Sequence, residues 1–151
     1  MREVLLVVHL IGVALWIGGG ALLAPWSARA RRTLQPSLVE FAAETTTWLT
    51  ERAILPAMVL TIASGVGLTV VAGLAARPPA WLIAKAALAI LGVVVLWAIQ
   101  RPSGQALVAV LRASSRRASA QVPHLVRRQQ RWGVISGVLA LAALALAVFK
   151  P

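Results

Sequence analysis

Two ionisable side chains lie inside otherwise apolar stretches of this sequence, and their types make them the first candidates for chemistry. His9 stands in the string VHLIG, and Lys85 stands in the string WLIAKAALAILGVVVL. An ionisable residue in hydrocarbon is costly, usually faces the interior of a helix bundle and marks a functional site by default. We therefore take His9 and Lys85 as candidate catalytic residues.

Each residue also has a simpler explanation. A histidine within a bundle can donate to a carbonyl of a neighbouring helix, and a lysine has a stem long enough to snorkel to the interface. His9 lies about 10 Å and Lys85 about 8 Å along its own helix, at 1.5 Å per residue. Both helices are expected to start from the same side of the membrane, which predicts that the two groups lie at a similar depth.

The neighbours of His9 leave space beside its helix. Residues Gly12, Trp16 and Gly19 share its helical face, and the two glycines would let a flat ligand or another helix approach beside the indole. A haem needs one axial histidine and an apolar slot. We expect His9 to be the axial ligand of a b-type haem iron, with Gly12 and Trp16 in the cofactor site. Lys85 would serve as second ligand or as partner of a tetrapyrrole carboxylate.

The elements that position these residues follow from the composition. The 151 residues are 60% hydrophobic and 13% charged, with a mean hydropathy of +0.84. A soluble domain carries roughly twice that charged fraction. Four apolar runs, at about 4–25, 54–74, 80–99 and 132–149, have the roughly 20 residues that cross a bilayer as a helix. The sequence therefore predicts an all-α integral membrane four-helix bundle forming a single domain, 1–151.

The distribution of arginine predicts the orientation. The formal net charge is +11, and the basic residues gather between the first and second runs and between the third and fourth. By the positive-inside rule both loops face the cytoplasm and both termini lie on the outer, periplasmic side of a bacterial cytoplasmic (inner) membrane. Anionic lipid headgroups are the expected partners of these arginines, and nucleic acid is not. The basic cluster after the first run also favours a retained anchor over a cleaved signal peptide.

Two cytoplasmic segments, at about 37–52 and 105–131, are predicted to be amphipathic helices. In the first, Ser37 and Glu40 have the spacing of a capping box, and the helix is expected to continue into the second span with a kink at Pro56. In the second, residues 105–117 and 124–131 are predicted to lie against the lipid surface.

Several residue types and motifs narrow the chemistry further. A stripe of small and polar residues on the second span, with Thr61, Ser64, Gly65 and Thr69, is typical of close helix packing. The chain has no cysteine, two methionines and two histidines, a poor supply of ligands for copper. It also lacks a glycine-rich dinucleotide fingerprint and a P-loop.

Four strings, in order, give the chain a resemblance to a known family. HLIGVALWIGGG resembles the first helix of HemJ-type protoporphyrinogen oxidases and CopD-like membrane proteins, and ERAILPAMVLT resembles the second HemJ-type helix. Lys85 follows a helix-starting tryptophan as in that family, and the closing FKP is similar. The resemblance implies that His9 is the haem-ligating or catalytic histidine and Lys85 the essential lysine. It also implies oxidation of protoporphyrinogen IX to protoporphyrin IX, with bound b-type haem passing electrons onward.

The chain also departs from that pattern. It has no tyrosine after the first helix, and the string AIQ (98–100) stands where the family has a histidine. The string RQQRWGVISG replaces an Asn-Glu-Val-Pro stretch before the fourth helix. The leading hypothesis is a haem- or tetrapyrrole-binding membrane protein, which as an oxidoreductase would hand electrons to a quinone or redox partner. The alternatives are a non-enzymatic accessory subunit, in a homo-oligomer or a larger membrane complex, and a CopD-like transport protein.

Overall fold

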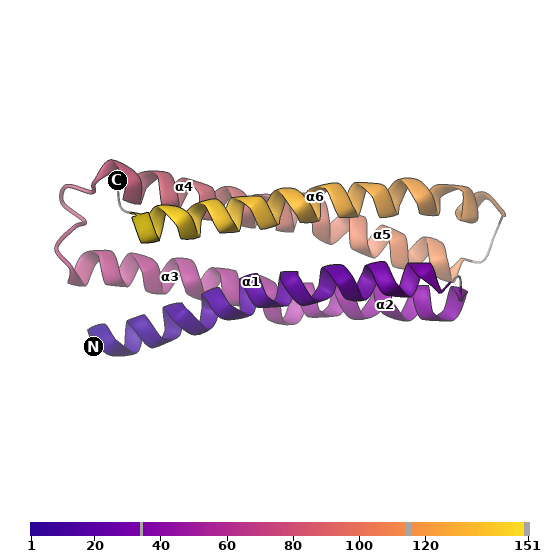
Figure 1. The fold of residues 1–151 in the computed structure, drawn as a ribbon, viewed down its shortest axis with the longest axis horizontal. Coiled ribbons are helices and arrows are strands. Elements are labelled where there is room, and N and C mark those ends of the chain that lie inside the picture. Colours follow the sequence, from indigo (N-terminus) through magenta and orange to yellow (C-terminus); the bar gives the residue numbers. More distant parts are fainter. Residues whose placement is uncertain (34, 114–115, 150–151) are drawn as a thin grey trace.

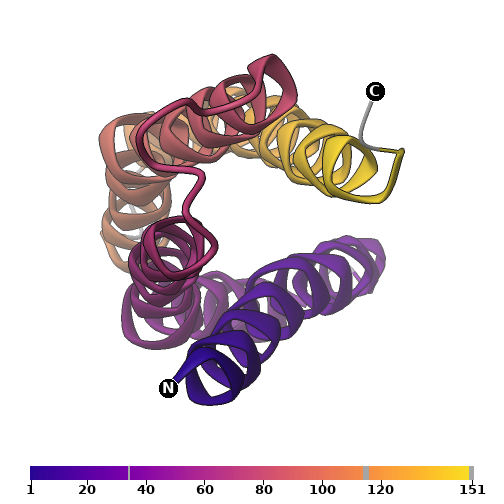
Figure 2. The same ribbon diagram turned by 90° about the vertical axis from the view of Figure 1, so that its left-hand side faces the viewer.

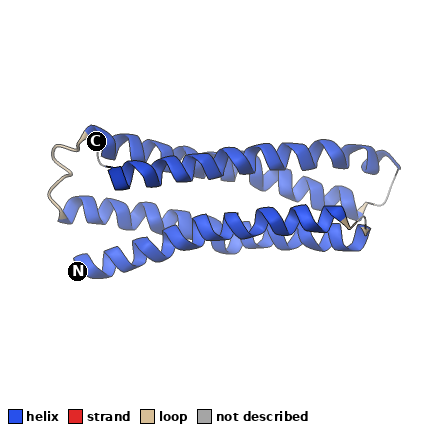
Figure 3. Ribbon diagram, viewed as in Figure 1, coloured by secondary structure: helices blue, strands red, loops and turns tan. Residues whose placement is uncertain are grey.

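The computed structural model describes residues 1–33, 35–113 and 116–149, and within these residues it is helical with no strand (Figure 3). The closing Lys-Pro of the sequence lies outside the described residues, as does its part in the resemblance. The predicted all-α class is confirmed. The elements are α1 (Arg2–Arg32), α2 (Pro36–Leu49), the π-helical turn η1 (Thr50–Ile54), α3 (Leu55–Val71), α4 (Ala80–Val95), the π-helical turn η2 (Leu96–Gln100), α5 (Arg101–Arg112) and α6 (Arg116–Phe149).

The helices form an elongated bundle of two pairs. Helix α1 packs along α3, and α4 packs along α6, whereas contact between the two pairs is thinner (Figure 2). The start of α1 and the end of α6 lie at the same end of the bundle, here called the terminal end (Figure 1). The last turns of α1 and α5 lie at the opposite end, here called the Arg-rich end (Figure 1). The described chain therefore runs from one end of the bundle to the other four times, and consecutive long helices are antiparallel.

Four helical segments are long and apolar enough to cross a membrane: 2–32, 37–71, 80–112 and 120–149. The second and third contain 35 and 33 residues, which at 1.5 Å per residue gives about 50 Å. Because the hydrocarbon core is only about 30 Å thick, these helices extend well beyond it. Their extensions form the Arg-rich end.

A π-helical turn interrupts both of these long helices at the same place relative to a proline. Leu55 N–H donates to the carbonyl of Thr50 just before Pro56, and Arg101 N–H donates to the carbonyl of Leu96 just before Pro102. Proline cannot donate to the carbonyl four residues earlier and its ring crowds that group. The wider turn accommodates the proline without ending the helix, so the irregularity expected at Pro56 is a π turn.

Two predictions about the Arg-rich end are wrong in detail. The second helix starts at Pro36 with Gln35 as its N-cap and no side-chain cap, so Ser37 and Glu40 do not form a capping box. Residues 105–112 continue the third span, and 116–131 belong to the same helix as the fourth span, rather than forming separate surface helices (Figure 1). The proline at the first turn of α2 needs no N–H partner, which makes it a favourable start.

Candidate functional site

The face of α1 that carries His9 packs against α3 through small residues. A Cβ atom on Gly12 would overlap Thr61 Oγ1 and lie 3.0 Å from the carbonyl oxygen of Ala57. A Cβ atom on Gly65 would lie 3.2 Å from Cε1 of His9. The predicted close packing of the small-residue stripe is therefore confirmed. Glycine at position 12 lets the two backbones approach, and glycine at position 65 leaves space for the ring of His9.

This close approach fixes the imidazole of His9. The Nδ1 atom lies 2.9 Å from the main-chain oxygen of Thr61 and 3.2 Å from Oγ of Ser64. The carbonyl can only accept, so Nδ1 carries the hydrogen and donates it. The Ser64 hydroxyl in turn donates to the carbonyl of Leu60, at 2.6 Å. The simpler explanation of His9, a hydrogen bond to a neighbouring helix carbonyl, is thus observed.

The same hydrogen bond determines what the other ring nitrogen can do. With the hydrogen on Nδ1, a neutral imidazole presents the lone pair of Nε2. His9 as a whole is only partly buried. A histidine held through Nδ1–H by a carbonyl, with Nε2 available, is the usual arrangement of a metal-ligating histidine.

Lys85 is placed near His9, as the topology predicts. It lies on the first turns of α4, at the terminal end where α1 also begins (Figure 1). Its side chain is partly buried, and its charge lies close enough to His9 to act on it electrostatically. The two intramembrane ionisable residues therefore belong to one region of the bundle, although they come from different helix pairs.

The other two predicted cofactor residues lie in packed positions. Gly12 is buried at the contact with α3, and Trp16 is 7% exposed in the core cluster. Ring atom Cζ2 of Trp16 would lie 3.2 Å from a Cβ atom on Gly92, and the cluster includes Ile54, Met58, Leu96 and Ala140. Gly12 packs against α3, and Trp16 packs against α4, on the side of His9 nearer the Arg-rich end. Contact of either residue with a cofactor stays a prediction.

The Arg-rich end contains ion pairs that the sequence did not reveal. Nε of Arg101 donates to Glu51 at 2.9 Å, and the side-chain amide of Gln105 donates to the same oxygen at 2.7 Å. Arg112 forms an ion pair with Glu44. The bond from Arg101 lowers the pKa of Glu51, which lies on the extension beyond the apolar span. These ion pairs join α2 and η1 to α5. Because the paired residues are far apart in the sequence, no local sequence pattern indicates the pairs.

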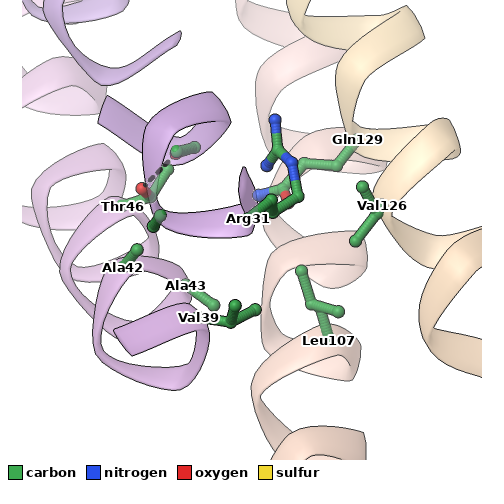
Figure 4. Close-up of a pocket in the computed structure, with 10 residues that line it drawn as sticks. Arg31, Val39, Ala42, Ala43, Thr46, Leu107, Val126 and Gln129 are labelled. Carbon is green, nitrogen blue, oxygen red and sulfur yellow. Dashed lines mark hydrogen bonds between the residues drawn. The ribbon is translucent and has the colours of Figure 1, made fainter. Parts of the chain in front are cut away.

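Two hollows also lie at the Arg-rich end. An open groove of about 570 Å³ runs between α2 and α5 and is lined by Phe41, Glu44, Trp48, Gln105 and Arg112 among others. A cavity of about 10 Å³, enough for roughly one water molecule, lies among α1, α2, α5 and α6 (Figure 4). It is lined by Ser27, Arg31, Thr46, Leu107, Val126 and Gln129 among others.

The described residues contain no group of three histidine, cysteine, aspartate or glutamate side chains that could hold a metal ion. A metal ion bound by protein side chains alone requires such a group, whereas a haem can be held by one axial histidine. His9 presents the lone pair of Nε2, and the charge of Lys85 acts on the same imidazole.

The four long apolar helices define a multi-pass integral membrane protein. The chain matches, over residues 3–151, the family described as "Predicted integral membrane protein (DUF2269)", and it belongs to that family. Neither the curated proteins nor the solved structures gave a match.

Proposed function

We propose that this protein binds a b-type haem or a related tetrapyrrole in the bacterial cytoplasmic membrane, with His9 as the axial ligand. The observation that carries the proposal is the hydrogen bond from Nδ1 of His9 to the main-chain oxygen of Thr61. It fixes the tautomer and the ring orientation, and it leaves Nε2 as the only nitrogen able to coordinate. Bound haem would supply one-electron transfer.

The role proposed for Lys85 follows from its charge and position. A tetrapyrrole carries carboxylate side groups, and a lysine cation in low-dielectric surroundings pairs with a carboxylate much more strongly than in water. Lys85 lies in electrostatic range of His9 but on the opposite helix pair. A carboxylate held there would orient a ligand between α1 and α4. Lys85 as a second axial ligand is the other arrangement that the same position supports.

The reaction proposed for such a protein is oxidation of protoporphyrinogen IX or a similar redox substrate, with electrons leaving to a quinone or a redox partner. This step depends on the HemJ-like strings around His9 and Lys85. In this role both ring nitrogens of His9 would be occupied, Nε2 by the haem and Nδ1 by its bond to Thr61, and Lys85 would supply a cation for a carboxylate of the substrate or of the haem. Enzymatic activity therefore depends on the haem proposal.

The first experiment is a reduced-minus-oxidised absorption spectrum of the purified protein. Sharp b-type bands are expected for the wild type, and they should disappear in His9→Ala. His124→Ala is the matched control, because His124 is the other histidine of the chain and lies on the exposed, Arg-rich part of α6. Stoichiometric haem retained in His9→Ala would contradict the assignment.

One observation favours a second function, that of a non-enzymatic accessory subunit. A Cβ atom on Gly18, Gly20 or Gly137 would meet nothing within 4 Å, so these glycines lie outside the contacts of the bundle. Small residues on the outer surface of a span let a further helix approach closely. A flat spectrum, even after haem is supplied during expression, would favour this function. A CopD-like transport role has no such observation in its support.

A further inference from the structure

The carboxylates at the Arg-rich end are all engaged by two arginines. The chain has four acidic residues, and three of them, Glu40, Glu44 and Glu51, lie on α2 and η1. Glu51 pairs with Arg101, and both Glu44 and Glu40 lie within ion-pair distance of Arg112, the latter at 3.9 Å. The fourth, a glutamate at position 3, belongs to the first turn of α1 at the terminal end. No other carboxylate side chain of the protein is available to the remaining arginines of the Arg-rich end.

Arg31 is the arginine for which this matters most. It lies in the last turn of α1, is partly buried, and within the described residues has neither an ion pair nor a hydrogen bond. Figure 4 shows its side chain beside that of Gln129 of α6, and both line the cavity at this end. A partly buried guanidinium without an anion is unfavourable, because it loses hydration without gaining a partner.

The surrounding charges point to an anion from outside the chain. Exposed arginines flank the pair on both helices: Arg29 and Arg32 on α1, and Arg127, Arg128 and Arg131 on α6. A guanidinium matches a phosphate through two parallel N–H···O bonds, and a glutamine amide can add a third donor. Since this end extends from four membrane-crossing helices, phospholipid headgroups are the phosphates nearest to it.

We propose that the Arg-rich end of the seam between α1 and α6, centred on Arg31 and Gln129, binds the phosphate of an anionic phospholipid. The bound headgroup would join α1 to α6, which touch each other much less than α1 touches α3 or α4 touches α6. This site lies at the opposite end of the bundle from His9 and does not depend on the haem proposal (Figure 1).

The test measures lipid retention by the full-length protein. Native mass spectrometry from detergent would follow binding of phosphatidylglycerol, phosphatidylcholine and inorganic phosphate to the wild type, to Arg31→Gln and to Arg77→Gln. Arg77 lies exposed in the loop between α3 and α4, so its replacement removes the same charge at the terminal end. Loss of one arginine contact is expected to weaken phosphatidylglycerol binding about fivefold in Arg31→Gln, and to leave Arg77→Gln like the wild type.

Three results would overturn the proposal. Equal retention of phosphatidylglycerol by Arg31→Gln and Arg77→Gln would show that Arg31 is not at the site. Equal binding of phosphatidylcholine would indicate apolar lipid contact only, and saturation by inorganic phosphate would indicate a free-anion site. If Arg31→Gln does not fold, Arg31→Lys keeps the charge and loses the bidentate geometry, so it should bind phosphatidylglycerol more weakly than the wild type.

Discussion

Replacing Gly12 with alanine should separate α1 from α3 and thereby disturb His9 one turn away. The added Cβ atom would overlap Oγ1 of Thr61, which is buried and donates to the carbonyl of Ala57 at 2.8 Å. It would also lie 3.0 Å from that carbonyl oxygen and 3.2 Å from the main-chain nitrogen of Thr61. Rotating the threonine cannot relieve these last two contacts, because they involve backbone atoms.

The expected cost follows from the size of this conflict. Inserting a methyl group into a well-packed contact typically destabilises a protein by about 1–3 kcal/mol. Alanine gains about 1 kcal/mol over glycine in a helix, but that gain applies equally to a glycine with open space beside it. Compared with such a control, Gly12→Ala should lose about 2 kcal/mol, which for a chain of this length corresponds to about 4–8 °C in the unfolding midpoint.

Gly18→Ala and Gly20→Ala are the matched controls, since a Cβ atom at either position of the same helix would meet nothing within 4 Å. Thermal unfolding in detergent, followed by circular dichroism, gives the midpoints of the three variants. The double variant Gly12→Ala with Thr61→Ala should recover part of the loss, because it removes Oγ1 but not the backbone contacts. A midpoint of Gly12→Ala equal to those of the controls would refute the close approach of α1 to α3 on which the position of His9 depends.

Two further predictions concern the haem site and the Arg-rich end. Gly65→Ala places a methyl group 3.2 Å from Cε1 of His9, so it should weaken haem retention several-fold with little change in the unfolding midpoint; unchanged haem titration would argue against the His9 assignment. Because the pKa of Glu51 is lowered by Arg101, its contribution to stability is present above the unfolded-state pKa and lost as pH falls through the folded-state pKa. The midpoint difference between wild type and Glu51→Gln, about 4 °C at most for a partly exposed pair, should therefore shrink in acid. A difference independent of pH would contradict the ion pair.

An ion pair connects the two π turns. Glu51 belongs to η1, and Arg101 directly follows η2, so the bond between them links the irregular turns of two long helices. In each helix the wide turn precedes a proline, and a proline inside a helix is a local sequence signal of distortion. That the two distorted places lie side by side is decided by packing, since positions 51 and 101 are far apart in the chain.

The sequence by itself determined the membrane class, the four spans and the two ionisable residues within them. Apolar length is a local property, and in lipid it requires a helix, so four runs of adequate length could be recognised without tertiary information. The small-residue stripe around Thr61 likewise predicted close packing, and the helical face shared by His9 and Gly12 is the one that meets it.

Only the tertiary structure decided which nitrogen of His9 carries the hydrogen, that Lys85 lies in its electrostatic range, and that Arg31 is left without a carboxylate. It also shows that α2 starts at Pro36 without the expected capping box. The expected surface helices are continuations of the third and fourth spans. The physical reason is the same in each case. Hydrogen bonds and ion pairs between helices depend on rotation and depth of one helix against another, and these are set by the sum of contacts along both helices.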